Sequence, residues 1–465
     1  MKSITNEINN IVNRGLDRHI RLAVTGLSRA GKTAFITSVV NQLLHSSRHS
    51  QLPLFAPTRD KRLIGAKRIP QVDLCTPRFD YDSAMNSLRK DPPEWPKPTR
   101  DVSEIRLALR YKAKSGALKY LQDTSTLYVD IVDYPGEWLL DLPLLDLDYL
   151  TWSKQQQKLL AGGRGQYAQP WLEACKDFDP LAAVDESKLA ELSALFTQYL
   201  HDCKDKGEFH WVQPGRFVLP GELEGAPVLQ FFPFIWLEQY SEDQLAKADK
   251  ESMYGILNKR YRHYQKKVVK QFYNQHFSQF DRQIILVDCL QPLNSGAEAF
   301  NDMRQALEQL MQSFKYGRSS LLSRLFSPKI DKLLFAATKA DHITPDQHSN
   351  LVSLLQQMTQ EAWNTASFEG IKMECQSIAS IAATQAGYVD QQGKPVPAIR
   401  GTSLQGLPLT VYPGDVPKRL PSQAFWNAQG FKFNSFRPLP YQHDEPLPHY
   451  RIDKVLQFLL GDKLV

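Results

Sequence analysis

The segment that most constrains this chain is Gly26-Leu-Ser-Arg-Ala-Gly31-Lys32-Thr33, which matches the phosphate-loop pattern GxxxxGK[ST]. Glycines let the backbone curl so that its N–H groups face phosphate oxygens without Cβ clashes. The segment lies between an apolar run, 20–25, that predicts a strand and a helical run, 33–44, whose N-terminus favours anions. This context predicts a nucleoside triphosphate site in an α/β fold.

The residues of this loop have separate expected roles. Lys32 would neutralise the β- and γ-phosphates, and Thr33 would offer its hydroxyl to Mg²⁺. Arg29 would either supply positive charge to the transition state or face solvent. The predicted nucleotide contacts in the loop are Ser28, Arg29, Ala30, Gly31, Lys32, Thr33 and Ala34.

A second motif, Asp133-Tyr-Pro-Gly136, follows the strand-like run 127–132. A carboxylate at the tip of a strand beside a phosphate loop can hold Mg²⁺ through water, so Asp133 is a predicted metal ligand. The backbone N–H of Gly136 would contact the γ-phosphate. The alternative reading is an ordinary turn, because tetrapeptides of this pattern are common.

A third motif, Thr338-Lys339-Ala-Asp341, follows the predicted strand 332–337. The Asp341 carboxylate can accept hydrogen bonds from N1–H and N2–H₂ of guanine, whereas adenine presents an acceptor at N1 and is disfavoured. The stem of Lys339 would lie along the base plane. The alternative is that Asp341 only caps a helix.

A fourth segment follows the predicted strand 372–377 and offers backbone N–H groups at Ser377, Ile378 and Ala379. One of these groups would contact guanine O6. A plain connection between a strand and a helix is the equal alternative.

The order of the remaining elements predicts a mostly parallel sheet flanked by helices, because strands and helices alternate from residue 283 to residue 377. Residues 45–100 lack periodicity and predict a long loop. Residues 139–280 are helical in pattern and predict an inserted subdomain, and residues 386–465 predict an irregular extension with a final helix near 452–460.

Together the four motifs resemble the Ras-like GTPase superfamily. Three runs, 21–36, 132–138 and 458–464, are similar to the YcjX-like family, and this resemblance covers nearly the whole chain. It implies a Ras-like P-loop core at 1–138 and 281–385, with a long switch-region insertion at about 45–100. It also implies GTP or GDP with Mg²⁺ as ligands, and a role in a bacterial stress response.

Departures from the Ras pattern affect the expected rate of GTP hydrolysis and the expected affinity for the guanine base. Thr338 replaces the usual asparagine, which suggests modest base affinity. Glu137 stands where Ras has the glutamine that orients water, and a carboxylate near the γ-phosphate is disfavoured, so slow hydrolysis is expected. The expected catalytic residues are Glu137, Arg29 and Gly136. For the threonine that closes on Mg²⁺ the preferred candidate is Thr99, ahead of Thr58 and Thr76.

Composition narrows the cellular setting. The five cysteines have no CxxC or metal-ligand spacing, and no apolar run approaches the roughly 18 residues of a membrane span. We therefore expect a cytoplasmic protein, with peripheral membrane attachment left open by its basic segments. Its expected partners are a guanine nucleotide and an effector or activating protein, and no nucleic acid.

Three functions remain in competition on the sequence alone. The first is a GTPase switch, the second a nucleotide-binding scaffold with negligible hydrolysis, and the third an ATP-using P-loop enzyme. The guanine-reading carboxylate predicted at Asp341 favours the first two over the third.

Overall fold

The computed structural model describes residues 19–47, 51–98, 101–113, 124–312, 330–360, 363–364, 370–428, 430–441 and 445–465. Thr99 lies outside these residues. The chain divides into two compact units. Unit 1 comprises Met1–Pro135, Phe280–Gly296 and Lys329–Val465, and unit 2 comprises Gly136–Gln279 and Ala297–Pro328.

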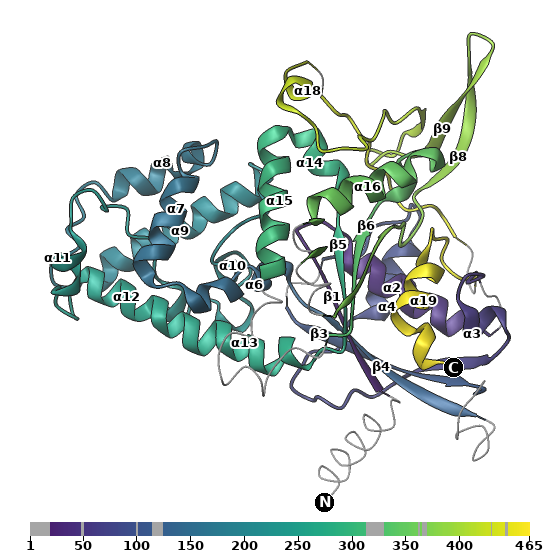
Figure 1. Ribbon diagram of the computed structural model, residues 1–465, viewed down its shortest axis with the longest axis horizontal. Helices are drawn as coiled ribbons and strands as arrows, with labels where there is room; N and C mark the ends of the chain where they lie inside the picture. Colours follow the sequence, from purple (N-terminus) through teal and green to yellow (C-terminus); the bar gives the residue numbers. More distant parts are fainter. Residues whose placement is uncertain are drawn as a thin grey trace, which may run out of the picture. The chain divides into compact units, whose positions relative to one another are not determined.

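The main sheet of unit 1 has seven strands among the described residues, in the order β2-β3-β4-β1-β5-β6-β7 (Figure 1). Strands β4, β1, β5, β6 and β7 run parallel, whereas β3 and β2 continue the sheet antiparallel. The bounds are β1 His19–Gly26, β2 Leu63–Ile69, β3 Ser103–Tyr111, β4 Ser125–Asp133, β5 Arg282–Val287, β6 Lys332–Ala337 and β7 Lys372–Ser377. The predicted α/β fold with a mostly parallel sheet is confirmed.

One face of the sheet carries the apolar core of unit 1. Alternate residues of β1, Ile20, Leu22 and Val24, belong to this core together with helix α2, Lys32–His45. The final helix predicted near 452–460 is present as α19, Ile452–Leu460. Leu456 and its apolar neighbours on this helix belong to the same core. The strand and the helix that flank the phosphate loop therefore share one core with α19.

Helix α19 is also held at its end by a buried guanidinium. Arg282, at the start of β5, has 1% side-chain exposure and lies 2.6 Å from Asp462. It also lies 3.0 Å from Asp331 and donates to the carbonyl of Leu459. Asp462, which follows α19, therefore supplies a counter-charge to Arg282 at the start of the central strand β5.

The segment 45–100 is not the continuous loop that the sequence suggested. It contains α3 Ala56–Arg59, strand β2, and α4 Tyr81–Leu88. Strand β2 lies at the sheet edge, and most of its side chains are at least partly exposed, so it lacks the apolar pattern that marks a buried strand.

The extension after residue 386 is likewise more regular than expected. A three-stranded antiparallel sheet is formed by β8 Thr384–Gln391, β9 Lys394–Thr402 and β10 Pro408–Val411. Its small core joins Ile399 to Phe436. Exposed residues are frequent in these strands and prolines interrupt β9, so periodicity does not reveal them.

Unit 2 is built from helices around an aromatic core. Trp152, for example, stacks on Tyr261 with ring centroids 5.2 Å apart. Its longer helices are α7 Tyr149–Leu159, α8 Gly165–Ala174, α9 Glu186–Asp205, α12 Met253–His263 and α15 Ala297–Gln312.

The sequence predicts that residues 281–385 belong to the core, but helix α15 within this range belongs to unit 2. Asp302 forms a buried ion pair with Arg164 and accepts the N–H of Trp211 at 2.9 Å, which ties the helix to the insertion. Among the described residues, none of the helices combines the length and apolar composition that a membrane crossing requires.

Candidate nucleotide site

Strand register brings the phosphate-loop, Asp133, Thr338–Asp341 and Ser377–Ala379 motifs to one edge of unit 1. Val24 of β1 pairs with Asp133 of β4, and Ala337 of β6 pairs with Ser377 of β7. Because these strands are parallel, their carboxyl ends meet at the same edge. The chain order also reverses direction at β1, and such a switch point is where open α/β sheets bind ligands.

The phosphate loop follows β1 with a backbone that favours glycine at two positions. A Cβ on Gly26 would lie 2.7 Å from the carbonyl oxygen of Leu286, closer than van der Waals contact allows. Gly31 has φ of 84°, in the left-handed region, and its carbonyl accepts the N–H of Phe35 at 2.9 Å. The first turn of α2 therefore begins at Lys32, and its N–H groups have no acceptor within the helix.

The predicted side chains of the loop differ in exposure. Arg29 is exposed and has φ of 62°, whereas Lys32 and Thr33 are half-buried at the start of α2. The carbonyl of Thr33 accepts the hydroxyl of Thr37 at 2.7 Å. The loop thus combines the Lys32 ammonium and the Thr33 hydroxyl with a helix N-terminus, a set that suits a polyphosphate.

Asp133 ends β4 with no solvent exposure. The next residue, Tyr134, is tied to β1, because its N–H donates to Val24 and its carbonyl accepts the hydroxyl of Thr25, each at 3.3 Å. Its own hydroxyl accepts from Gln283 at 2.6 Å, and burial raises the pKa of this phenol well above its ordinary value. The strand tip that carries Asp133 is therefore fixed in place.

The donor set suits Mg²⁺ bound mainly through phosphates. The described residues contain no group of three or more His, Cys, Asp or Glu side chains that would hold a metal on its own. Mg²⁺ in such sites takes one or two protein oxygens and completes its shell with phosphate and water. Thr33 and Asp133 supply oxygens of the required kind. Of the other threonine candidates, Thr76 is engaged with Asp73 at 2.6 Å.

Gly136 and Glu137 belong to unit 2, where they begin the short helix α6, Gly136–Leu139. Oε1 of Glu137 lies 2.7 Å from Nζ of Lys204 on α9, and Glu137 is 4% exposed. A Cβ on Gly215 would lie 2.1 Å from the carbonyl oxygen of Glu137, so this backbone is tightly packed. The predicted water-orienting residue is held by a cation of the inserted helices.

The turn after β6 carries the predicted base-reading residues. The N–H of Thr338 donates to the carbonyl of Val287 at 2.9 Å, and its hydroxyl approaches the same oxygen at 3.4 Å. The Thr338 side chain therefore braces β5. Lys339 has φ of 58°, and its Nζ lies 2.5 Å from Oδ2 of Asp288.

Asp341 is half-buried and already oriented by the protein. Its Oδ2 accepts the N–H of Ala383 at 2.6 Å, and its backbone carbonyl accepts the hydroxyl of Thr384. A carboxylate has about four acceptor positions, so this bond leaves room for further donors. No motif in the sequence marks Ala383, which lies 42 residues from Asp341 along the chain.

The segment after β7 is bound within the protein. The N–H of Ile378 donates to Ala337 at 2.8 Å, and that of Ala379 donates to Tyr450 at 3.1 Å. The carbonyl of Ile378 accepts the N–H of Ala340 at 3.0 Å, which links this segment to the Thr338–Asp341 turn. A contact from Ile378 or Ala379 to guanine O6 would compete with these bonds and stays a prediction.

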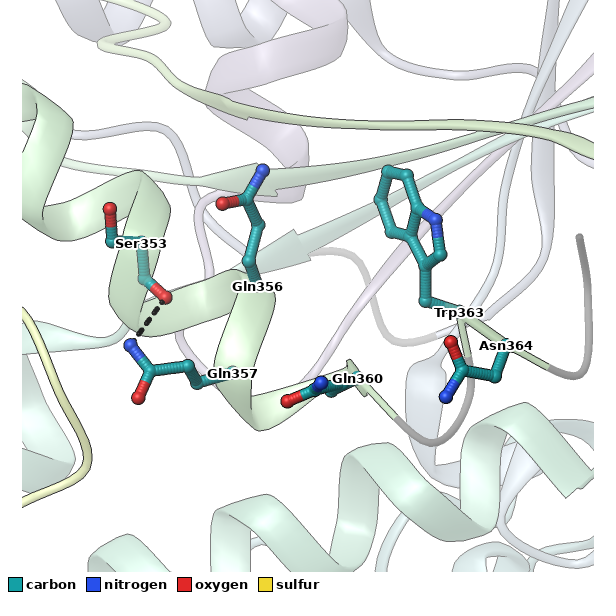
Figure 2. Close-up of a pocket in the computed structure, with 6 residues that line it drawn as sticks. All are labelled: Ser353, Gln356, Gln357, Gln360, Trp363 and Asn364. Atoms are coloured by element: carbon teal, nitrogen blue, oxygen red, sulfur yellow. Dashed lines mark hydrogen bonds between the residues drawn. The ribbon is translucent and has the colours of Figure 1, made fainter.

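Two hollows lie elsewhere in the described residues. One of about 460 Å³ lies beside α16, His348–Met358, and the lining side chains drawn in Figure 2 are polar or aromatic; these described residues are Ser353, Gln356, Gln357, Gln360, Trp363 and Asn364. The other, of about 980 Å³, lies in unit 2 and carries both acidic and basic groups, such as Asp148 and Lys266. Neither contains a residue of the predicted nucleotide site.

Comparisons with known proteins find similarity over nearly the whole chain. The model of the YcjX-like family matches residues 20–464. A protein of Escherichia coli strain K12 called "Ras-like GTPase YcjX" is 60% identical over 465 residues, which is 100% of both chains. A protein of Shewanella oneidensis with the same name is 47% identical over 477 residues, covering 100% of this chain and 98% of that one. The predicted Ras-like P-loop core is thereby confirmed.

Proposed function

The chain belongs to the YcjX-like family, and from this premise we propose that it binds GTP and GDP with Mg²⁺ at the carboxyl edge of unit 1 and hydrolyses GTP slowly. The observation that carries the proposal is the Asp341 carboxylate, oriented by the N–H of Ala383 at the edge where the phosphate loop also lies. Two independent parts of one ligand, its base and its phosphates, would each find a complementary group there.

The phosphates would be held by the loop between β1 and α2. N–H groups of the first helical turn and the Lys32 ammonium would face the phosphate oxygens, while Arg29 is exposed beside them. Thr33 and Asp133 would hold the metal ion. Bound Mg²⁺ neutralises charge on the β- and γ-phosphates.

The base would be read by Asp341. The bond from Ala383 fixes the plane of the carboxylate, and its remaining lone pairs would accept N1–H and N2–H₂ of guanine. Adenine would place an acceptor against the same oxygens, which costs on the order of a few kcal/mol. The ATP-using alternative is therefore disfavoured.

We propose slow hydrolysis of GTP because Glu137 already forms an ion pair within the protein. Its carboxylate pairs with Lys204, and a negative group near the γ-phosphate would also be repelled. The same ion pair supports a second candidate function, a nucleotide-dependent scaffold with negligible hydrolysis. The roles of Gly136 at the γ-phosphate and of Glu137 toward water remain predictions.

The output we propose is a nucleotide-dependent interaction with an effector or activating protein in a bacterial stress response. Unit 2 begins at Gly136, immediately after the Asp133-Tyr-Pro segment that would respond to the nucleotide. Segments at this place in switch proteins order around the γ-phosphate. A change at the nucleotide would thus reach the inserted helices through the chain itself.

A competition titration on the full chain tests the proposal. GTP and GDP are expected to bind with Mg²⁺ at least about a hundredfold more tightly than ATP, because a mismatched polar contact carries that order of discrimination. Phosphate release is expected to be slow but above that of a Lys32→Ala control. Tighter binding of ATP would refute guanine recognition, and release no faster than the control would favour the scaffold.

A further inference from the structure

A carboxylate outside the predicted motifs holds the base-reading turn. Asp288 follows β5 and is only 3% exposed. Its Oδ2 lies 2.5 Å from Nζ of Lys339, while its Oδ1 accepts the N–H groups of Leu290 and Gln291 at 3.1 and 3.2 Å. Oδ1 thus binds the start of the helix that follows β5, and Oδ2 binds the turn that follows β6.

Electrostatics favours the charged form of this pair. Burial acts to raise the pKa of Asp288, but the Lys339 ammonium, its hydrogen bond and the Gln291 N–H outweigh burial, and the pKa lies below its ordinary value. A buried carboxylate that stays ionised requires a fixed counter-charge. Lys339, whose side chain is 32% exposed, supplies this charge and is restrained by it.

We propose that Asp288 is a positioning residue for base recognition: it fixes Lys339, and with it the turn to Asp341, before the nucleotide arrives. This inference rests on the proposed function, in which the Lys339 stem flanks guanine. Lysine has a flexible stem that must be ordered when it packs on a base. The ion pair with Asp288 holds the end of the lysine side chain before the nucleotide binds, so less conformational entropy is lost on binding, which is preorganisation.

The backbone of the turn supports the same role. Lys339 adopts a left-handed φ of 58°, which side-chain-bearing residues rarely adopt without support from their surroundings. The N–H of Ala340, the next residue, is bound to Ile378. The ion pair therefore acts on one side of a turn whose other side is fixed by backbone bonds, and Asp341 lies at the end of that turn.

Substitution of Asp288 by asparagine separates this role from the bonds to the next helix. The side-chain oxygen of asparagine accepts backbone N–H groups as that of aspartate does, so the bonds from Leu290 and Gln291 can persist. It cannot provide the negative charge for Lys339. A matched control is Asp281→Asn at the other end of β5, where the carboxylate accepts the N–H of Arg21 at 2.8 Å.

The test measures binding of GDP, ADP and inorganic pyrophosphate, each with Mg²⁺, to the full chain by calorimetry. For Asp288→Asn we expect GDP binding to weaken about tenfold, the effect of losing one charge-assisted hydrogen bond. Pyrophosphate lacks the base and so should bind as it does to the wild type, and Asp281→Asn should change the binding of neither ligand. KM for GTP should rise with kcat unchanged.

A double-mutant cycle with Lys339→Met adds a second measurement. If the two side chains act as one unit, the double variant should bind GDP no more weakly than Lys339→Met alone. Unchanged GDP binding by Asp288→Asn, an equal loss in Asp281→Asn, or additive losses in the cycle would each overturn the inference. Preference of the wild type for ADP over GDP would instead overturn the proposed function.

Discussion

In unit 2 the ammonium of Lys204 lies 2.7 Å from the carboxylate of Glu137, and their side chains are only 14% and 5% exposed. A pair so shielded from water is little screened by salt. Loss of one charge leaves the other buried without its counter-ion, which is far more costly than loss of a surface pair. The start of the inserted helices is therefore fastened at the residue after Gly136.

Replacing Lys204 by methionine should lower the free energy of unfolding by about 3–5 kcal/mol, the usual cost of removing one partner of a buried ion pair. Glu137→Gln in the same background should recover much of the loss, because a neutral amide replaces the buried charge. Chemical denaturation measures both effects.

The matched control is Lys206→Met at the C-cap of the same helix. Lys206 is 65% exposed and pairs with Asp202, so its removal should change stability by less than about 1 kcal/mol. Equal stability of Lys204→Met and the wild type would show that this ion pair does not hold the segment.

Gly26→Ala should disrupt the phosphate loop. The new Cβ would meet the Leu286 carbonyl at 2.7 Å and the Leu286 Cβ at 3.0 Å, and neither belongs to the movable end of a side chain. We expect a loss of about 1–3 kcal/mol of stability from overpacking, and GDP binding weakened at least about tenfold as the loop shifts. Thermal unfolding and calorimetry measure the two effects.

Gly65→Ala provides the comparison for this substitution. A Cβ at Gly65, in the edge strand β2, has no atom within 4 Å, so alanine should be neutral there or slightly stabilising. Normal GDP binding by Gly26→Ala would mean that the close approach to Leu286 is not required.

Asp141 predicts a pH dependence of stability. Burial raises its pKa to about 7 despite hydrogen bonds from the Tyr264 hydroxyl and the Gly215 N–H. The unfolded chain releases this proton near the ordinary value of 3.8, whereas the folded chain keeps it until about 7. Between these values the unfolded state binds fewer protons, so stability from this group declines as pH rises and the loss is complete above about 7.

Asp141→Asn should remove this decline, because its amide carries no charge at any of these pH values. The melting temperature of the variant relative to the wild type should therefore be higher at pH 8 than at pH 5. A constant difference across this range would show that Asp141 does not titrate as its burial implies.

Buried parallel strands were the easiest elements to predict. Strands 332–337 and 372–377 were placed at the bounds later observed, and the motifs after them met at one sheet edge because parallel register allows nothing else. Strand β2 and the β8–β10 sheet were missed, since exposed residues hide their period.

The partners of the base-reading residues were missed for a different reason. Asp288 lies 51 residues before Lys339, and only the pairing of β5 with β6 brings them together. No local pattern marks such a residue. The bond from Ala383 to Asp341 likewise depends on where the chain returns after β7.

The position of α19 within the core of unit 1 has a consequence for synthesis. Its apolar residues, including Leu456 and Leu459, belong to the same core as those of β1, more than four hundred residues earlier, and Arg282 forms an ion pair with Asp462. A ribosome that has already made the phosphate loop and Asp341 has not yet supplied this last layer. We therefore expect nascent chains to acquire a stable unit 1 only after translation has passed Asp462.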